Sequence, residues 1–183
     1  MYELFGTITN RDKFVYLSDG GHFENLGVYE LVRRRCALIV VSSCGKDSEY
    51  AFDDLANAIR LCNIDFGVVI EVEPRAIKPD EHGTSKAQYV IGRIRYSALG
   101  EGLDDGTLVY IKPAITARTS VDIRQYRSVN PDFPQQSTAN QWYTESQFES
   151  YRKLGLETAR SAFARGTSVR AMFDGLTAEL HAR

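Results

Sequence analysis

The stretch Cys36-Ala-Leu-Ile-Val-Val41 decides the fold class of this 183-residue chain, because it is a short apolar run that is rich in β-branched residues. Such a run is typical of a strand that is buried on both faces of a sheet. Apolar residues recur at helical spacing on either side of it, over residues 26–35 and 48–64. Arg33, Arg34 and Arg35 end the first of these segments, where positive charge stabilises a helix C-terminus and a solvated role is expected.

Further strands are predicted at residues 13–18 and 66–72, so the order is strand, helix, strand, helix, strand. This order is typical of a parallel sheet covered by helices. Downstream, residues 88–96 alternate between polar and apolar, and residues 106–112 form a second strand-like run. We therefore predict an α/β fold with a mainly parallel sheet and an antiparallel hairpin at its edge.

Residues 129–141 are predicted to be irregular, because two prolines there oppose a helix. A helix is predicted over residues 144–164, with Thr144 as its N-cap and Gln147 as the partner in a capping box. A final helix is expected over residues 168–182.

The composition is that of an ordinary globular domain, with 43% hydrophobic residues and a formal net charge of −2. This balance excludes a disordered chain and argues against a dedicated nucleic-acid binder. The apolar runs are far shorter than the roughly 18 residues of a membrane span, and the first residues do not resemble a signal peptide. We expect a cytoplasmic protein, with membrane association left open for a longer form of it.

The cysteines and histidines are scattered and show no metal-ligand spacing, so no metal and no cofactor are predicted. These residues are Cys36, Cys44, Cys62, His22, His82 and His181.

Residues 18–27, Ser-Asp-Gly-Gly-His-Phe-Glu-Asn-Leu-Gly, are the most informative for chemistry. Asp19 follows a predicted strand, at the position where open α/β sheets place their ligands. Gly20 and Gly21 allow a tight turn and the close approach of a substrate. The other interpretation is that Asp19 only stabilises a turn or caps a helix, since Asp-Gly is a common turn pair. Asn25 can likewise hold the Asp19 loop or cap the following helix.

The run of residues 16–36 resembles the aspartate-bearing segment of bacterial patatin-like phospholipases. Residues 53–60 and 133–152 resemble the same family, so the similarity covers residues 13–155. The resemblance implies a three-layer α/β/α patatin-like fold and the hydrolysis of lipid acyl esters by a serine–aspartate dyad.

In that family the aspartate of D-G-G is the base of the dyad, and the matching residue here is Asp19. It would accept the proton of a serine hydroxyl as the hydroxyl attacks the ester carbonyl. The dyad requires no histidine, so the resemblance gives His22 at most a supporting role, beside Gly20, Gly21 and Asn25, in holding the loop or the substrate.

The sequence lacks the G-x-S-x-G motif and the glycine-rich oxyanion loop of the family. We therefore expect residues 1–183 to be a single partial domain, the carboxyl-terminal portion of a patatin-like domain whose serine lies outside this chain. Ser42 and Ser43 are not expected to replace that serine, because no glycine stands two positions before either of them. Cys44 has no identifiable base.

Three hypotheses about function remain. The chain is the aspartate-carrying part of a serine acyl hydrolase, or a non-catalytic regulatory or interaction domain that keeps the fold, or an enzyme with another chemistry around Asp19. The expected partners are a lipid or acyl-ester substrate, a peripheral membrane surface, and a second copy joined through an exposed strand edge. Tyr143, Phe148 and Tyr151 are expected to pack in the core or at its edge rather than to form a membrane-inserting patch.

Overall fold

The computed structural model describes residues 19–163, three residues before them (Thr9, Arg11 and Lys13) and six after them (171, 174, 175, 177, 178 and 180). The strand predicted over residues 13–18 lies outside the described residues except for Lys13. Most of the final helix predicted over residues 168–182 also lies outside them, and its six described residues are helical.

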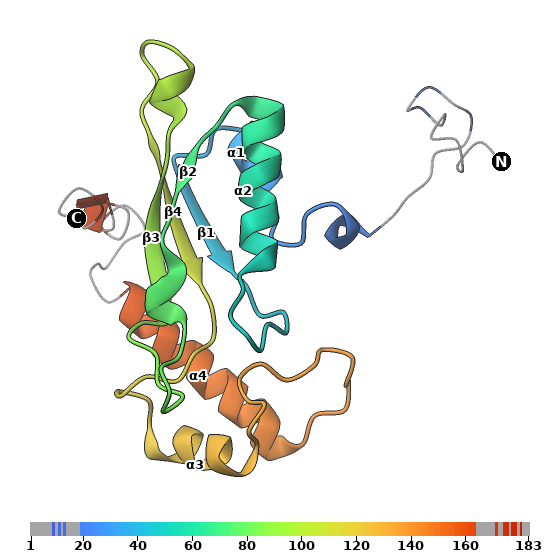
Figure 1. Cartoon of the computed structure of the whole chain (residues 1–183), viewed down its shortest axis with the longest axis vertical. Helices are drawn as coiled ribbons and strands as arrows, with labels where there is room; N and C mark the ends of the chain where they lie inside the picture. The colour runs from blue at the N-terminus through green and yellow to red at the C-terminus, as the bar shows by residue number, and fades with distance from the viewer. Residues whose placement is uncertain are drawn as a thin grey trace.

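Four strands form one mixed sheet in the order β1-β4-β3-β2. Their bounds are β1 Leu38–Ser42, β2 Ile70–Glu71, β3 Tyr89–Ile94 and β4 Gly106–Ile111. The pair β1 and β4 is parallel, whereas β4 with β3 and β3 with β2 are antiparallel. The described residues therefore form an α/β fold with a mixed sheet and the helices α1 to α4, beside the helical residues near the carboxyl end (Figure 1).

The predicted hairpin is present, but the prediction that it lies at the edge of a mainly parallel sheet is wrong for the described residues. Its strands pair over six positions, from Tyr89 opposite Ile111 to Ile94 opposite Gly106. β4 is buried along almost its whole length, because β1 pairs with its other side. Of the described strands, β1 and β2 are therefore the outer ones, and only one of the three pairings is parallel.

The run that decides the fold class forms β1, but only one of its faces is fully covered. Ile39 and Val41 are buried, whereas Val40 is 45% exposed. The alternation shows that β1 is covered mainly on the face that carries α1 and α2, so the prediction of burial on both faces is wrong for the described chain.

The helices α1 (Val28–Arg33) and α2 (Asp53–Phe66) lie side by side against one face of the sheet (Figure 1). They form the main core with β1, β3 and β4. The helix α2 continues to Phe66 and ends at Gly67, whose φ of 67° is in the left-handed region that glycine adopts readily. The strand predicted over residues 66–72 is therefore reduced to the two residues of β2.

A pair of helices, α3 (Val121–Val129) and α4 (Glu145–Phe163), lies beyond the carboxyl ends of β1 and β4 (Figure 1). A second core joins them around Ile115, Ile123, Phe133 and Leu154. The Thr144 hydroxyl accepts a hydrogen bond from the Gln147 backbone N–H at 3.1 Å, which confirms the predicted N-cap. The Gln147 side chain bonds to Gln136 instead of completing a capping box.

Side chains from the end of the chain pack on the opposite face of the sheet. Phe163 at the end of α4 and Leu180 contact a small cluster centred on Ile91 and Val109. Among the described residues, no helix combines the length and the apolar character needed to cross a membrane.

Candidate functional site

Asp19 lies at the start of a short 3₁₀ turn, η1 (Gly20–His22), and its side chain caps that turn. The Gly21 backbone N–H donates to Asp19 Oδ1 at 3.0 Å, and the His22 N–H donates to the Asp19 carbonyl oxygen at 3.1 Å. Asp19 and His22 are both exposed. Asp19 does not line the polar cavity, the apolar cleft or the wide depression described below. In this geometry the Asp19 side chain stabilises a turn, which is the structural role that the Asp-Gly pair indicates.

Gly21 and Asn25 fit closely together inside this loop. A Cβ atom at Gly21 would lie only 2.9 Å from Asn25 Oδ1, so a larger residue would displace the Asn25 side chain. Nothing described lies within 4 Å of a Cβ placed at Gly20. Asn25 Nδ2 donates to Asp54 Oδ2 at 3.2 Å, so Asn25 connects the loop to the first turn of α2.

Glu24, which the sequence analysis did not single out, holds the end of this loop. Its side chain is buried and accepts backbone hydrogen bonds from Leu26 at 2.6 Å and from Tyr29 at 3.1 Å. Between these two donors the chain turns at Gly27, whose φ is 73°, and then begins α1. A carboxylate near a helix N-terminus satisfies N–H groups that have no partner inside the helix. Glu24 therefore fixes where α1 begins relative to the Asp19 loop.

A second side chain of α2 holds the loop. Asn57 Nδ2 donates to the Phe23 carbonyl oxygen at 3.3 Å. The Phe23 ring packs edge-on against Tyr29 at a centroid distance of 4.9 Å. The loop that carries Asp19 is thus attached at Phe23, Glu24 and Asn25 to the body of the domain.

A polar cavity of about 220 Å³ lies where β1 and β4 end. It is lined by Ser43, Lys46, Asp47, Phe52, Asp53, Asp54, Tyr110 and Lys112. Asp54 is also the residue that Asn25 contacts, so the Asp19 loop borders this cavity. The carboxyl ends of neighbouring parallel strands are the usual place for a ligand in an α/β sheet.

The charged groups of the cavity are partly engaged with one another. The buried Lys112 places Nζ 3.5 Å from Asp47 Oδ2 and donates to the Gly45 carbonyl oxygen at 3.4 Å. Burial raises the pKa of Tyr110 to about 12, although a hydrogen bond from its neighbour Ser43 acts in the opposite direction. Tyr110 is therefore a neutral phenol at physiological pH, able to donate or accept a hydrogen bond but not to act as an anion.

The loop that closes the cavity contains two aromatic residues in the left-handed region, Tyr50 at φ 50° and Phe52 at φ 59°. This conformation costs roughly 1–2 kcal/mol for a residue with a side chain. The Asp47 carboxylate stabilises it by accepting hydrogen bonds from the backbone N–H groups of Ala51 at 2.8 Å and Phe52 at 3.1 Å. Gln135 supports it further, donating to the Tyr50 hydroxyl at 3.3 Å.

Ser42 and Ser43 follow β1 and face different surroundings. Ser42 is exposed, with its Oγ 3.5 Å from Cys44 Sγ, and Ser43 is buried beside Tyr110. Ser42 and Cys44 line an apolar cleft of about 270 Å³ between the strand ends and α4. No carboxylate or imidazole is among the described residues that line this cleft, so they supply neither side chain with a base.

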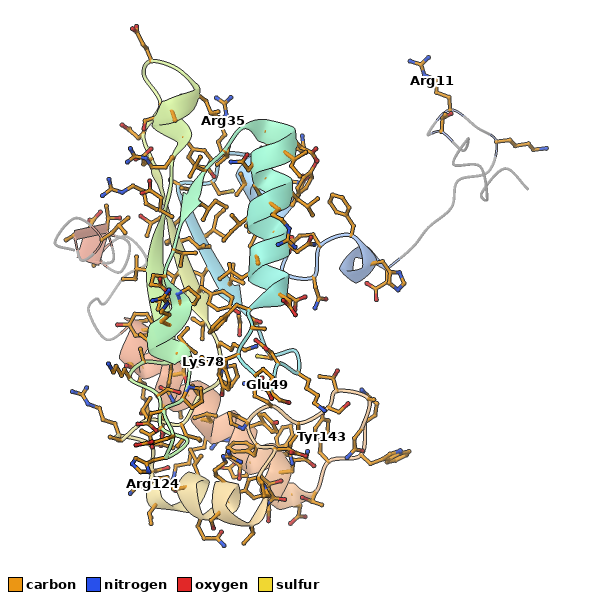
Figure 2. The ribbon with its side chains drawn as sticks, in the orientation of Figure 1. Arg11, Arg35, Glu49, Lys78, Arg124 and Tyr143 are labelled. Carbon is orange, nitrogen blue, oxygen red and sulfur yellow. The ribbon has the colours of Figure 1, made fainter. Side chains whose placement is uncertain are left out.

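The aromatic residues near the start of α4 differ from the prediction. Tyr151 is half-buried and packs on Phe133, as predicted. Tyr143 is 49% exposed and Phe148 is 61% exposed, and the adjacent Trp142 is 88% exposed. Figure 2 shows Tyr143 on the segment that leads into α4. Tyr143 and Phe148 are therefore not core residues, because α4 turns this side toward solvent.

Comparison with family models, with curated proteins and with solved structures gives no match for this chain. Among the described residues, no group of three or more histidine, cysteine, aspartate or glutamate side chains could hold a metal ion.

Proposed function

We propose that this chain is the aspartate-bearing part of a patatin-like serine acyl hydrolase that cleaves lipid acyl esters. The observation that carries the proposal is the run of residues 16–36, with Asp19 at the position of the family's catalytic aspartate. The nucleophilic serine is supplied by residues outside this sequence. The three-layer α/β/α arrangement of the family is part of the proposal, supported by the packing of Phe163 and Leu180 opposite α1 and α2.

In this mechanism Asp19 accepts the proton of the serine hydroxyl as the hydroxyl attacks the ester carbonyl. One of its oxygens accepts the hydrogen bond from Gly21, which orients the carboxylate. An ionised carboxylate offers about four lone-pair sites, so accepting the bond from Gly21 is compatible with a proton-accepting role. The attachment of the loop through Glu24 and Asn25 supports this role by limiting where Asp19 can move.

A lipid substrate agrees with two features near the ends of the strands. The apolar cleft lined by Ser42 and Cys44 is suited to an acyl chain. The exposed Trp142, Tyr143 and Phe148 form the kind of aromatic surface that favours a membrane–water interface. We propose that the protein is cytoplasmic and meets its substrate by peripheral contact with a membrane.

A non-catalytic regulatory or interaction domain is the second candidate. It is favoured by the missing G-x-S-x-G motif and by the use of Asp19 Oδ1 as a turn cap. The two candidates differ in whether the complete protein hydrolyses esters through Asp19.

The test uses an extended protein in which a segment with the G-x-S-x-G motif precedes this sequence, assayed on chromogenic fatty-acyl esters. Asp19→Asn keeps an oxygen that can cap Gly21, because asparagine and aspartate are comparable caps, but it removes the base. We expect it to lower kcat by about 10²–10⁴-fold with an unchanged melting temperature.

Glu73→Gln is the matched control, because Glu73 caps η2 (Pro74–Ile77) through the Arg75 N–H as Asp19 caps η1. It should leave kcat unchanged. Equal activity in Asp19→Asn and the parent protein would exclude Asp19 as the base. No hydrolysis by the extended protein would favour the non-catalytic domain.

A further inference from the structure

A wide depression lined by described residues lies away from the residues that hold the Asp19 loop and has a volume of about 990 Å³. Its walls come from the segment that precedes β3, the turn that follows β4 and the last turns of α4. It shares no residue with the polar cavity beside Asp54. Three segments that are distant in sequence thus meet around one open site.

Each of these three segments brings a cation to the depression. Lys86 precedes β3, Arg118 lies in the turn after β4, and Arg160 lies on α4. All three side chains are exposed, and none forms an ion pair with another described residue. Three like charges around one depression repel one another, so this arrangement favours an anionic ligand.

The two carboxylates of the depression, Asp80 and Glu157, both accept backbone hydrogen bonds, and the charge of Lys86 also acts on Asp80. Asp80 Oδ1 accepts backbone hydrogen bonds from Thr84 at 2.9 Å and from His82 at 3.0 Å. The pKa of Asp80 is below its usual value, mainly because of the hydrogen bond from the Thr84 backbone N–H. Glu157 Oε2 accepts a hydrogen bond from the Ser120 backbone N–H at 3.4 Å. The site therefore keeps an excess of one positive charge, with its two acids held in local structure.

A buried hydroxyl in the same wall points independently to a ligand. Ser85 is only 3% exposed, and its Oγ has no hydrogen-bond partner among the described residues. A buried polar group without a partner is costly, and native proteins contain few of them. The hydroxyl can rotate to donate to an acceptor that enters the depression.

We propose that this depression binds a phosphate group, held by Arg118, Arg160 and Lys86 and accepting a hydrogen bond from Ser85. Guanidinium groups match the geometry of phosphate oxygens, and lysine adds a point charge. The phosphate comes either from a soluble phosphorylated molecule or from the headgroup of an anionic phospholipid. The site goes beyond the proposed hydrolase, because it uses none of that mechanism's residues.

The test measures the affinity of the 183-residue chain for inorganic phosphate by calorimetry, against sodium chloride at matched ionic strength. The double variant Arg118→Gln and Arg160→Gln should bind phosphate at least about tenfold more weakly. A control with the same change of charge is Arg35→Gln with Arg124→Gln, two residues that Figure 2 places at opposite ends of the molecule. The control should bind phosphate as the parent chain does.

Ser85→Ala separates the role in binding from any role in folding. It should weaken phosphate binding without lowering the melting temperature, because the Ser85 hydroxyl has no hydrogen-bond partner among the described residues. Binding of phosphate no stronger than that of chloride, or equal affinities in the Arg118/Arg160 variant and the parent chain, would overturn the proposal.

A second arm identifies the source of the phosphate. The chain is sedimented with phosphatidylcholine vesicles that contain phosphatidic acid and with vesicles of pure phosphatidylcholine. Sedimentation with the phosphatidic acid vesicles alone, abolished in the Arg118/Arg160 variant, would assign a lipid headgroup. Phosphate binding without sedimentation would assign a soluble ligand. Both results support the phosphate site.

Discussion

Replacing Glu24 tests whether the loop that carries Asp19 is held as the structure indicates. Glu24→Ala removes the acceptor of two backbone hydrogen bonds, from Leu26 at 2.6 Å and from Tyr29 at 3.1 Å, in a buried setting. Hydrogen bonds to charged groups are worth about 1.5–3 kcal/mol, and losing an N-terminal cap costs about 0.5–2 kcal/mol. We therefore expect a loss of about 2–3 kcal/mol, which corresponds to a melting temperature lower by roughly 4–12 °C at this chain length.

The assay is urea unfolding followed by circular dichroism, together with a thermal scan. Glu24→Gln keeps one acceptor oxygen and should give an intermediate loss. Glu73→Ala is the control, because this exposed residue accepts a single backbone hydrogen bond, from Arg75 at 3.1 Å. A loss for Glu24→Ala no larger than that for Glu73→Ala would refute the role assigned to Glu24.

Three further predictions concern the fold. Leu108 lies in the centre of the sheet and has no exposed surface, so Leu108→Ala should lower the free energy of unfolding by about 2–5 kcal/mol in a urea titration. A smaller decrease than that caused by a substitution at an exposed position would contradict the assigned core. The Lys153 side chain, hydrogen-bonded to Asp122, lowers the pKa of Asp122 from 3.8 to about 2, so the link between α3 and α4 should stabilise the fold above pH 3.8 and be lost as the pH falls through 2. Asp122→Asn should therefore reduce the acid sensitivity of unfolding measured across this range, and an unchanged profile would exclude the link. The outer edge of β1, unpaired among the described strands, should promote self-association in light scattering, whereas a monodisperse monomer would contradict this.

Local patterns predicted the elements that depend on local interactions. The helical periodicity of residues 48–64 corresponds to α2, and Thr144 caps α4 as its position before that helix indicates. The run of residues 88–96 corresponds to β3, but the exposed face that its alternation predicts is absent, because successive residues of β3 are buried. In the described part of the chain, fold class and hairpin could thus be predicted from the sequence.

Other features depend on contacts that the sequence does not display. The place of β4 between β1 and β3 is a matter of pairing, which local patterns do not encode. The helix α3 was not predicted, because most of its residues are polar and no clear apolar periodicity results. Its burial depends on the packing of Ile123 against α4, which the sequence does not display. The end of α2 at Gly67 could have been predicted, since glycine commonly follows the last helical turn.

The candidate site also combines features that local patterns predict with features that depend on long-range contacts. The sequence drew attention to Asp19 and its glycines, but the connection of Asn25 to Asp54 spans 29 residues and appears only in the fold. Glu24 was missed because an isolated glutamate is expected at the surface. Its position a few residues before a helix was the available signal.

The most direct test of the central claim is the distance between the Asp19 carboxylate and the nucleophilic serine in a crystal structure of the extended protein. The serine–aspartate mechanism predicts an Asp19 oxygen within hydrogen-bond reach of the serine Oγ, at about 2.6–3.2 Å. A structure in which Asp19 only caps the Gly21 N–H and the serine lies beyond reach, including through one water, would contradict it.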